Sequence, residues 1–265
     1  MIKIAIGLLS LAGVAFLFGA QQPSSGSMAE LAPSGKLRVG INFGNALLAV
    51  RSDGASGGIA VDLARELSKR IGRPMEIIPY ASARELVDGA KNLAWDVAFL
   101  ATDPDRAAEI IFTAPYLEID TTYLVPPGSP LRTLADVDRQ GIRISVSDRS
   151  AYDLFLTRFL KRAQLVRAPN VPASVELYFE QRLEALAGLK PLLMEAAERQ
   201  PGSRVLDGRF TVVEQAVGAP IGHAAAAAYL RDFVETVKAS GLVAQIIQKN
   251  GVRGVSVAPA ARHVQ

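Results

Sequence analysis

The 265-residue sequence contains no cysteine, which excludes disulfide bonds and metal sites built from thiolates. Its two histidines, His223 and His263, are too far apart along the chain for a zinc motif. We therefore expect neither a metal nor a cofactor. Dense runs of one charge are also missing, because 29 basic and 26 acidic residues are interspersed and leave a net charge of +3. Such mild basicity does not predict a nucleic-acid partner.

Motifs of common catalytic sites are missing as well. The chain has no glycine-rich phosphate loop and no Gly-x-Ser-x-Gly elbow. What it has is ordinary globular composition, with 49% apolar and 21% charged residues, which is enough for one large domain or two modest ones.

The longest apolar run lies at the N-terminus. Lys3 precedes apolar residues 4–18, and Gly19 and Ala20 follow, which is the layout of a secretory signal. We expect residues 1–20 to be a signal peptide cleaved after Ala20. The alternative is an uncleaved anchor, because the run is only a little short of the roughly 20 residues that cross a bilayer. Residues 21–35 are rich in Gln, Ser, Pro and Gly and predict a flexible linker.

The rest of the chain alternates between strand and helix patterns. Residues 37–42 and 74–80 are predicted strands, and an amphipathic helix is predicted between them over 58–72. This alternation predicts an α/β fold. Further strands are expected over 95–100, 121–126, 142–147 and 210–217, and further helices over 83–91, 150–163 and, in two segments, 223–249.

The stretch FLATDPDRAAEIIFTAPY, residues 99–116, has the features of an anion site. Thr102 or Asp103 would cap a short helix with Pro104 in its first position, and Arg106 would follow in the first turn. Free amides at a helix start and a guanidinium together suit a carboxylate. Spacing alone leaves open the alternative that Arg106 is a solvated residue paired with Asp103 or Glu109.

Residues 36–257 resemble the family 3 solute-binding proteins, extracytoplasmic receptors that deliver amino acids and related polar solutes to ABC importers. The segments that carry the resemblance are KLRVGIN, GGIAVDLARELSKRIGRPMEII, WDVAFLATDPDRAAEIIFTAPY and SGLVAQIIQKNG. The resemblance implies a type II periplasmic-binding-protein fold, in which two α/β lobes are joined by two crossover strands. Its expected divisions are a first lobe from residues 36–125 and 209–257, a second lobe from 126–208, and a disordered tail over 258–265.

The resemblance also implies a function. The protein would be a periplasmic monomer that captures a small carboxylate-bearing solute, an amino acid or related organic acid, between its lobes. It would deliver this solute to an ABC permease in the inner membrane. In this family the arginine that matches Arg106 grips the α-carboxylate of the ligand, so the same role is expected here.

The family pattern implies further ligand-binding positions, and at some of them this chain has a different residue type. Asn42 lies where the family often places Asp or Asn at the cleft, Asn45 replaces an aromatic residue that commonly stacks on the ligand, and Ala101 replaces a hydroxyl residue. The full set of expected ligand-binding residues is Arg106, Asn42, Phe43, Ala101, Ser147, Ser150, Ala151 and Lys190.

The largest departure lies at residues 188–190. Amino-acid binders usually carry an Asp there that pairs with the ammonium group of the ligand, whereas this chain has Gly188, Leu189 and Lys190. A buried ammonium group without a carboxylate partner is costly. We therefore expect a ligand with a carboxylate and a weakly charged or anionic remainder. Lys190 is either a second cation for it or a solvated residue, and the sequence leaves open whether Glu184 or Glu195 reaches the cleft.

The alternative function is catalytic, because periplasmic cyclohexadienyl dehydratases share this fold, as do sensor and lytic-transglycosylase modules. A dehydratase needs a positioned general acid or base, for which Lys190, Glu184 and Glu195 are the candidates. No residue pair has a spacing that demands catalysis, so a binding protein that is not an enzyme is the leading expectation.

Overall fold

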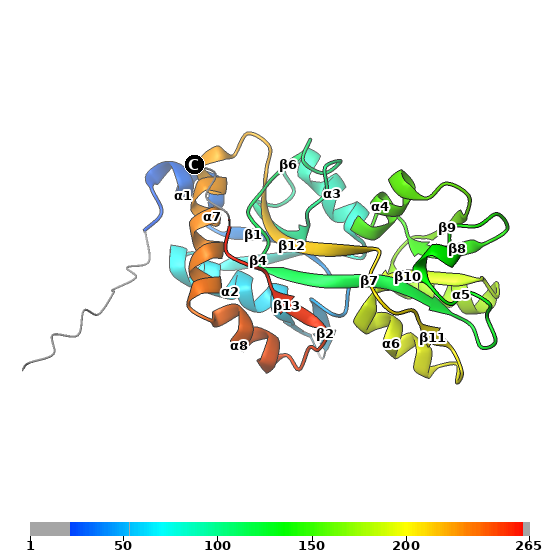
Figure 1. Ribbon diagram of the computed structural model, residues 1–265. Helices are drawn as coiled ribbons and strands as arrows, with labels where there is room; N and C mark the ends of the chain where they lie inside the picture. The colour runs from blue at the N-terminus through cyan, green and yellow to red at the C-terminus, as the bar shows by residue number, and fades with distance from the viewer. Residues whose placement is uncertain (1–21, 53, 262–265) are drawn as a thin grey trace, which may run out of the picture.

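The computed structural model describes residues 22–52 and 54–261, so the predicted signal peptide and the last four residues lie outside it. The described chain forms two α/β lobes around a continuous mixed sheet, with strand order β4-β1-β5-β12-β7-β10-β8-β9 (Figure 1). This arrangement confirms the predicted two-lobed fold class.

The first lobe holds the parallel strands β4, β1 and β5, together with most of β12. Its strands and helices are α1 Ser25–Leu31, β1 Leu37–Asn42, β2 Val50–Ser52, β3 Ala55–Gly57, α2 Ile59–Ile71, β4 Met75–Tyr80, α3 Ala83–Lys91, β5 Val97–Ala101, β6 Ile110–Phe112, β12 Thr211–Pro220, α7 Ala224–Ala239, α8 Leu242–Lys249 and β13 Val255–Val257.

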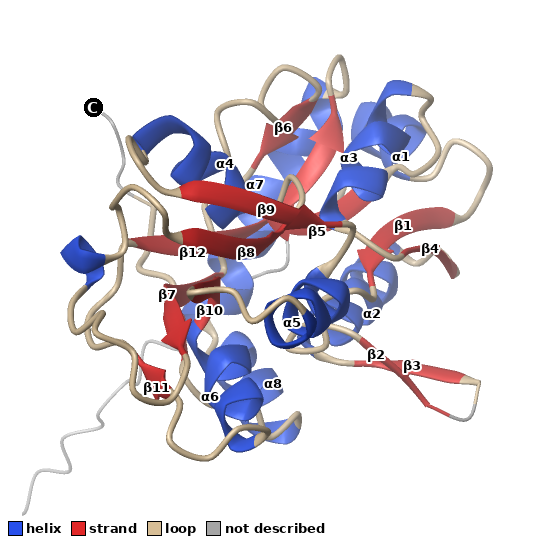
Figure 2. Ribbon diagram, turned by 90° about the vertical axis from the view of Figure 1, so that its right-hand side faces the viewer, coloured by secondary structure: helices blue, strands red, loops and turns tan. Residues whose placement is uncertain are grey.

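The second lobe is built on the parallel strands β10, β8 and β9. Its strands and helices are the 3₁₀ turn η1 Leu134–Asp136, β8 Arg143–Ser147, α4 Ala151–Phe159, β9 Gln164–Ala168, α5 Val171–Glu180, β10 Ala185–Leu189, α6 Lys190–Glu198 and β11 Arg204–Val205. In Figure 2 α5 and α6 lie on one side of these strands and α4 on the other.

Strand β7, Leu117–Val125, joins the two lobes (Figure 1). Its first half pairs antiparallel with β12 and its second half pairs antiparallel with β10. The exchange of partner occurs at Thr121, which is opposite both Thr211 and Leu189. The Thr121 hydroxyl donates to the Thr211 carbonyl at 2.7 Å, which fixes the sheet at the point where one lobe becomes the other.

Alternation along β1 explains how the first lobe packs. Val39 and Ile41 join the main core with Leu63 and Leu67 of α2, whereas Gly40 faces the opposite side. A Cβ at Gly40 would lie only 3.0 Å from the ring of Trp95, which is fully buried beside α3. The sheet of the first lobe is therefore covered by helices on both faces, as expected for parallel strands.

The parallel strands of each lobe end at the same edge. β1, β4 and β5 end at Asn42, Tyr80 and Ala101, and β8 and β9 end at Ser147 and Ala168. In open α/β sheets, ligands bind outside the carboxyl ends of such strands. The register therefore brings the loops after these strands together at one edge in each lobe.

The predicted flexible linker over 21–35 is wrong for its central part. Ser24 caps the helix α1, Leu31 is fully buried, and α1 packs against α7. Its Glu30 carboxylate accepts a hydrogen bond of 2.7 Å from the amide of Ala226, in the first turn of α7. No side chain of α7 itself caps that helix, so α1 supplies the missing acceptor.

The disordered tail predicted over 258–265 is wrong for its first residues, which are held on the first lobe. Val255–Val257 pairs with β7, and Ala258 is buried. Lys238 donates to the Pro259 carbonyl at 2.8 Å, which holds the following residues on α7. Residues 262–265 lie outside the described part.

Within residues 22–52 and 54–261, no helix has the length and hydrophobicity required to cross a lipid bilayer.

Replacing Glu30 by alanine tests the docking of α1. Loss of a helix-capping acceptor should lower the free energy of unfolding by about 1 kcal/mol, and the melting temperature by about 2–4 °C. Thermal unfolding followed by circular dichroism measures this. Glu198→Ala, at an exposed position of α6, is the matched control, and equal melting temperatures for the two variants would contradict the capping role.

Candidate functional site

A cavity of about 50 Å³ lies between the lobes, where the carboxyl ends of the parallel strands converge. Its small volume and its lining from both lobes show that the lobes are close together here. The described residues that line it are Asn42, Gly44, Asn45, Leu48, Ala60, Ala81, Ser82, Ala83, Phe99, Leu100, Ala101, Arg106, Ser147, Ser150, Ala151, Tyr152, Asn170, Val171, Leu189, Val213 and Gln215.

The first lobe contributes the loop after β1, the start of α3 and the turn that carries Arg106. The loop after β1 approaches the loop after β4 so closely that a Cβ at Gly44 would lie 2.0 Å from the Ala81 carbonyl oxygen. Only glycine fits this approach. The Asn42 side chain fixes the same loop, because its Oδ1 accepts from the Gly44 amide at 2.9 Å.

The second lobe contributes the starts of two helices. Ser150 caps α4 by accepting from the Asp153 amide at 3.1 Å, and Asn170 caps α5 by accepting from the Ala173 amide at 2.9 Å. Both helices therefore point their N-termini, which carry partial positive charge, at the cavity.

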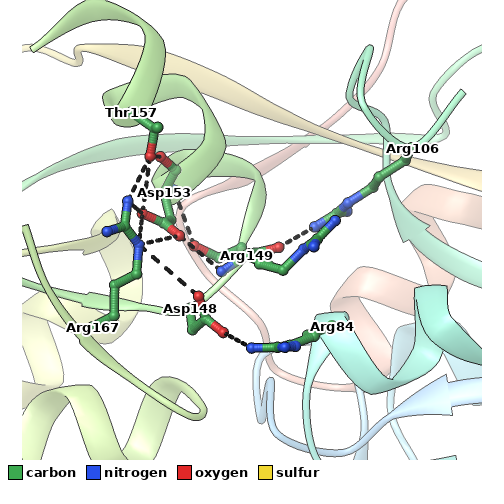
Figure 3. Close-up of polar contacts among 8 residues, drawn as sticks. Arg84, Arg106, Asp148, Arg149, Asp153, Thr157 and Arg167 are labelled. Atoms are coloured by element: carbon green, nitrogen blue, oxygen red, sulfur yellow. Dashed lines mark hydrogen bonds and ion pairs between the residues drawn. The ribbon is translucent and has the colours of Figure 1, made fainter.

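The predicted short helix after Thr102 is absent. Residues 104–109 form a series of turns, in which the Asp103 carbonyl accepts from the amides of Arg106 and Ala107. The Asp103 side chain accepts from the Asp105 amide at 2.9 Å, so it caps a turn in place of a helix. Arg106 nevertheless extends from this turn toward the second lobe (Figure 3).

The guanidinium of Arg106 is held by two backbone carbonyls. Its Nη1 donates to Ala101 of the first lobe at 2.6 Å, and its Nη2 donates to Arg149 of the second lobe at 2.9 Å. The residue is only 3% exposed. Burial lowers the pKa of Arg106 to about 10, so the group stays protonated at neutral pH.

No carboxylate of the described residues lies within ion-pair distance of Arg106. The alternative pairing with Asp103 does not occur, because Asp103 accepts two bonds from Arg158, at 2.8 and 3.2 Å. Asp103 and Asp105 favour the charge of Arg106 only from beyond ion-pair distance, and a buried charge without a direct counter-ion is costly unless a partner binds there. The arrangement is therefore suited to an anion that enters the cavity.

Ion pairs across the cleft hold the lobes together beside the cavity. Arg158 of α4 reaches Asp103 and, at 3.5 Å, Asp105 of the first lobe. Arg84 of α3 donates to Asp148 of the second lobe at 2.7 Å. Figure 3 shows Arg84 and Arg106 entering from one lobe and meeting residues 148 and 149 of the other.

The loop that meets Arg106 is itself tightly fixed. Arg149 has a φ of 52°, in the left-handed region that few non-glycine residues adopt. Its amide donates to the buried Asp153 carboxylate at 2.8 Å, and that carboxylate also accepts from Arg167 Nε at 3.1 Å (Figure 3). These bonds fix the direction of the Arg149 carbonyl that accepts from Arg106.

Six of the eight residues expected at the site line the cavity, namely Asn42, Ala101, Arg106, Ser147, Ser150 and Ala151. Phe43 does not, because its ring packs against the core and lies under the Arg51 guanidinium at 4.4 Å. Lys190 does not either. It lines a separate groove between α6 and the loop after α8, so it is not a second cation in the cavity.

The open question about the two glutamates is also answered. Glu184 accepts from Arg143 Nε and Nη2 at 2.9 and 2.8 Å, and Glu195 lines the same groove as Lys190. Neither reaches the cavity.

Sequence reasoning missed Ser82, Tyr152, Asn170 and Gln215, which all line the cavity. Ser82 and Asn170 follow predicted or observed strands and precede helices, so a search for N-caps at strand ends could have found them. Burial raises the pKa of Tyr152 to about 12, so its hydroxyl is neutral and is a donor as well as an acceptor. Nothing in the local sequence marks Gln215, whose place depends on the pairing of β12.

Comparison with known proteins identifies the family. Residues 37–252 match the model of the bacterial extracellular solute-binding proteins, family 3. The chain therefore belongs to this family, as the sequence resemblance predicted. A search of curated protein sequences gave no match.

Solved structures with the same fold are similar at low sequence identity. The solute receptor for L-cysteine of Neisseria gonorrhoeae is 20% identical, with a TM-score of 0.74 over 87% of this chain and 96% of that one. The substrate-binding protein AbpA from Streptococcus pneumoniae, bound to L-arginine, is 18% identical, with a TM-score of 0.72 over 83% and 96%. The ancestral amino acid-binding protein AncCDT-1, described as a precursor of cyclohexadienyl dehydratase, has the same identity and TM-score over 84% and 98%.

Family membership makes the protein a solute-binding protein. Proteins of this kind bind small molecules and work with ABC transporters, and the family is extracellular.

Replacing Arg158 by methionine tests the ion pairs across the cleft. The change leaves the buried Asp103 without its main partner, so the fraction of molecules with separated lobes should increase. Because the chain has no cysteine, spin labels attached through Arg73→Cys and Gln181→Cys report the distance between the lobes by pulsed electron paramagnetic resonance.

The matched control is Arg199→Met. It removes an exposed ion pair with Glu176 that lies within the second lobe. We expect longer interlobe distances for Arg158→Met only, and identical distance distributions for both variants would contradict a role of Arg158 in closure.

Proposed function

We propose that the protein captures a small carboxylate-bearing solute in the cavity between its lobes and delivers it to an ABC importer. The observation that carries this proposal is the buried guanidinium of Arg106, which faces the cavity without a carboxylate partner. The amino-acid ligands named for the neighbouring structures support a solute of this size and chemistry.

The chemistry of the site favours a carboxylate. A guanidinium presents five N–H donors in a plane, of which two are used by the carbonyls of Ala101 and Arg149. The remaining donors match the two oxygens of a carboxylate. On the facing lobe, the first amides of α4 have no intrahelical acceptor and lie at the same cavity through Ser150 and Ala151.

Capture follows from contacts to both lobes. A ligand that bonds to Arg106 on one lobe and to the start of α4 on the other gains its full interaction energy only when the lobes are together. Such differential affinity shifts the population toward the closed form. Bending of β7 and β12 near Thr121 would allow the closure.

The closed form would then be recognised by a permease in the inner membrane. We propose that the protein acts there as a periplasmic monomer. The extracellular nature of the family supports the location.

The site favours the function of a binding protein over that of a dehydratase-like enzyme. The residues proposed as acid or base, Lys190, Glu184 and Glu195, lie outside the cavity, and among the described lining residues there is no Asp, Glu, His or Lys. The one lining residue with a titratable hydroxyl, Tyr152, has its pKa raised by burial to about 12, far from neutral pH. General acid–base catalysis needs such a group within reach of the substrate.

Replacing Arg106 by methionine tests the carboxylate contact while roughly preserving side-chain length. A thermal-shift screen over succinate, propionate, pyruvate and the common amino acids identifies a carboxylate ligand of the unmodified protein, and calorimetry gives its affinity. Affinity should fall by more than tenfold, because a charge-assisted hydrogen bond contributes roughly 1.5–3 kcal/mol.

The exposed Arg162, replaced by methionine, is the control and should bind as the unmodified protein does. Unchanged affinity in Arg106→Met, or no binding of any carboxylate by the unmodified protein, would overturn the proposal.

A further inference from the structure

The side chains that line the cavity offer many hydrogen-bond donors and no carboxylate. Asn42, Asn45 and Asn170 each use the side-chain oxygen to accept from a backbone amide, of Gly44, Leu47 and Ala173 respectively. Only the oxygen of a side-chain amide can accept a hydrogen bond from a backbone N–H group, so these bonds fix which end of each amide faces the backbone. The NH₂ group of each, which is a donor only, is the part left for a ligand.

The serine hydroxyl groups add further donors. Ser82 and Ser150 accept from the amides of Glu85 and Asp153, so each has one lone pair occupied and keeps its O–H group as a donor. Arg106 has no acceptor at all. The two carbonyls closest to it, of Ala101 and Arg149, are already used by its own nitrogens.

Three helices add positive potential to these donors. α3, α4 and α5 begin at Ala83, Ala151 and Val171, and all three residues line the cavity. The first amides of each helix have no intrahelical acceptor, and each N-terminus carries about half a positive charge. The acids in the first turns of α3 and α4 are directed elsewhere, because Glu85 accepts from the Ala81 amide and Asp153 from Arg149 and Arg167.

We infer that the ligand is a compact dianion that offers only acceptors, namely a short dicarboxylate without an ammonium group. One carboxylate bonds to Arg106 and the second to the remaining amide, hydroxyl and helix N-terminal donors. An amino acid would bring three N–H donors into a cavity whose described lining contains no carboxylate. This inference rests on the proposed function and names the substrate class for the same site.

Gln215 is the one exception among the amide side chains of the lining. It is 4% exposed, and the described residues give its side-chain amide no hydrogen-bond partner. It can therefore turn either its oxygen or its nitrogen to a ligand. A single substitution at this position would add a carboxylate to a lining that has none.

Matched ligands test the inference on the unmodified protein. Succinate and L-aspartate have the same two carboxylates and differ by one ammonium group, and propionate lacks the second carboxylate. Calorimetry should show that succinate binds about tenfold or more tightly than either, because a buried polar group without a partner costs at least this factor.

Tighter binding of L-aspartate, of propionate or of a neutral amino acid would overturn the inference and leave the proposed carboxylate receptor intact, provided that Arg106→Met abolishes that binding. Failure of every carboxylate to bind would overturn both.

Gln215→Glu provides the second test. The new carboxylate lies in the cavity lining, so it should weaken succinate binding by about tenfold or more and shift the preference between succinate and L-aspartate by a similar factor toward L-aspartate. Gln215→Met, which removes the amide without adding charge, and Gln248→Glu, which adds the same charge on the exposed face of α8, are the controls. An unchanged preference in a folded Gln215→Glu protein contradicts the inference, and if this variant does not fold, the ligand comparison on the unmodified protein decides.

Discussion

The buried guanidinium of Arg106 is the constraint on which the site depends. Its charge is held by one carbonyl from each lobe, and the nearby carboxylate of Asp103 is engaged by Arg158. The side chain is therefore fixed before an anion arrives, so that little rotamer entropy remains to be lost on binding. The same two bonds place the strained loop at Arg149 and the turn after β5 on opposite sides of one small space.

Much of this could be predicted from the sequence, because strong local patterns coincide with the final fold. The strand over 37–42, the amphipathic helix α2 and the break between α7 and α8 follow from periodicity and from glycine at helix ends. Arg106 was predicted as an anion ligand from its position after a strand and from the family resemblance. It faces the cavity although the helix expected to carry it is replaced by turns.

The remaining errors arise where the path of the chain or its tertiary contacts, and not the local pattern, decide the outcome. Phe43 follows Asn42 but packs under Arg51, because β1 ends at Asn42 and the chain turns there. Lys190 follows Leu189 but lines another groove, because β10 ends at Leu189 and α6 begins at Lys190. Gln215 enters the site only through the pairing of β12 with β5 and β7, which no local pattern encodes. The polar composition of residues 21–35 predicted a linker, whereas tertiary contacts with α7 stabilise α1.

The exchange of partners along β7 has a mechanical consequence. Since the strand is hydrogen-bonded to β12 on one side of Thr121 and to β10 on the other, any rotation of one half of the molecule against the other concentrates torsion in the few backbone angles around this residue. The stiffness of that short segment sets how readily the molecule opens. Sequence changes there, well removed from any solute, would tune the rates of uptake and release while leaving the chemistry of recognition untouched.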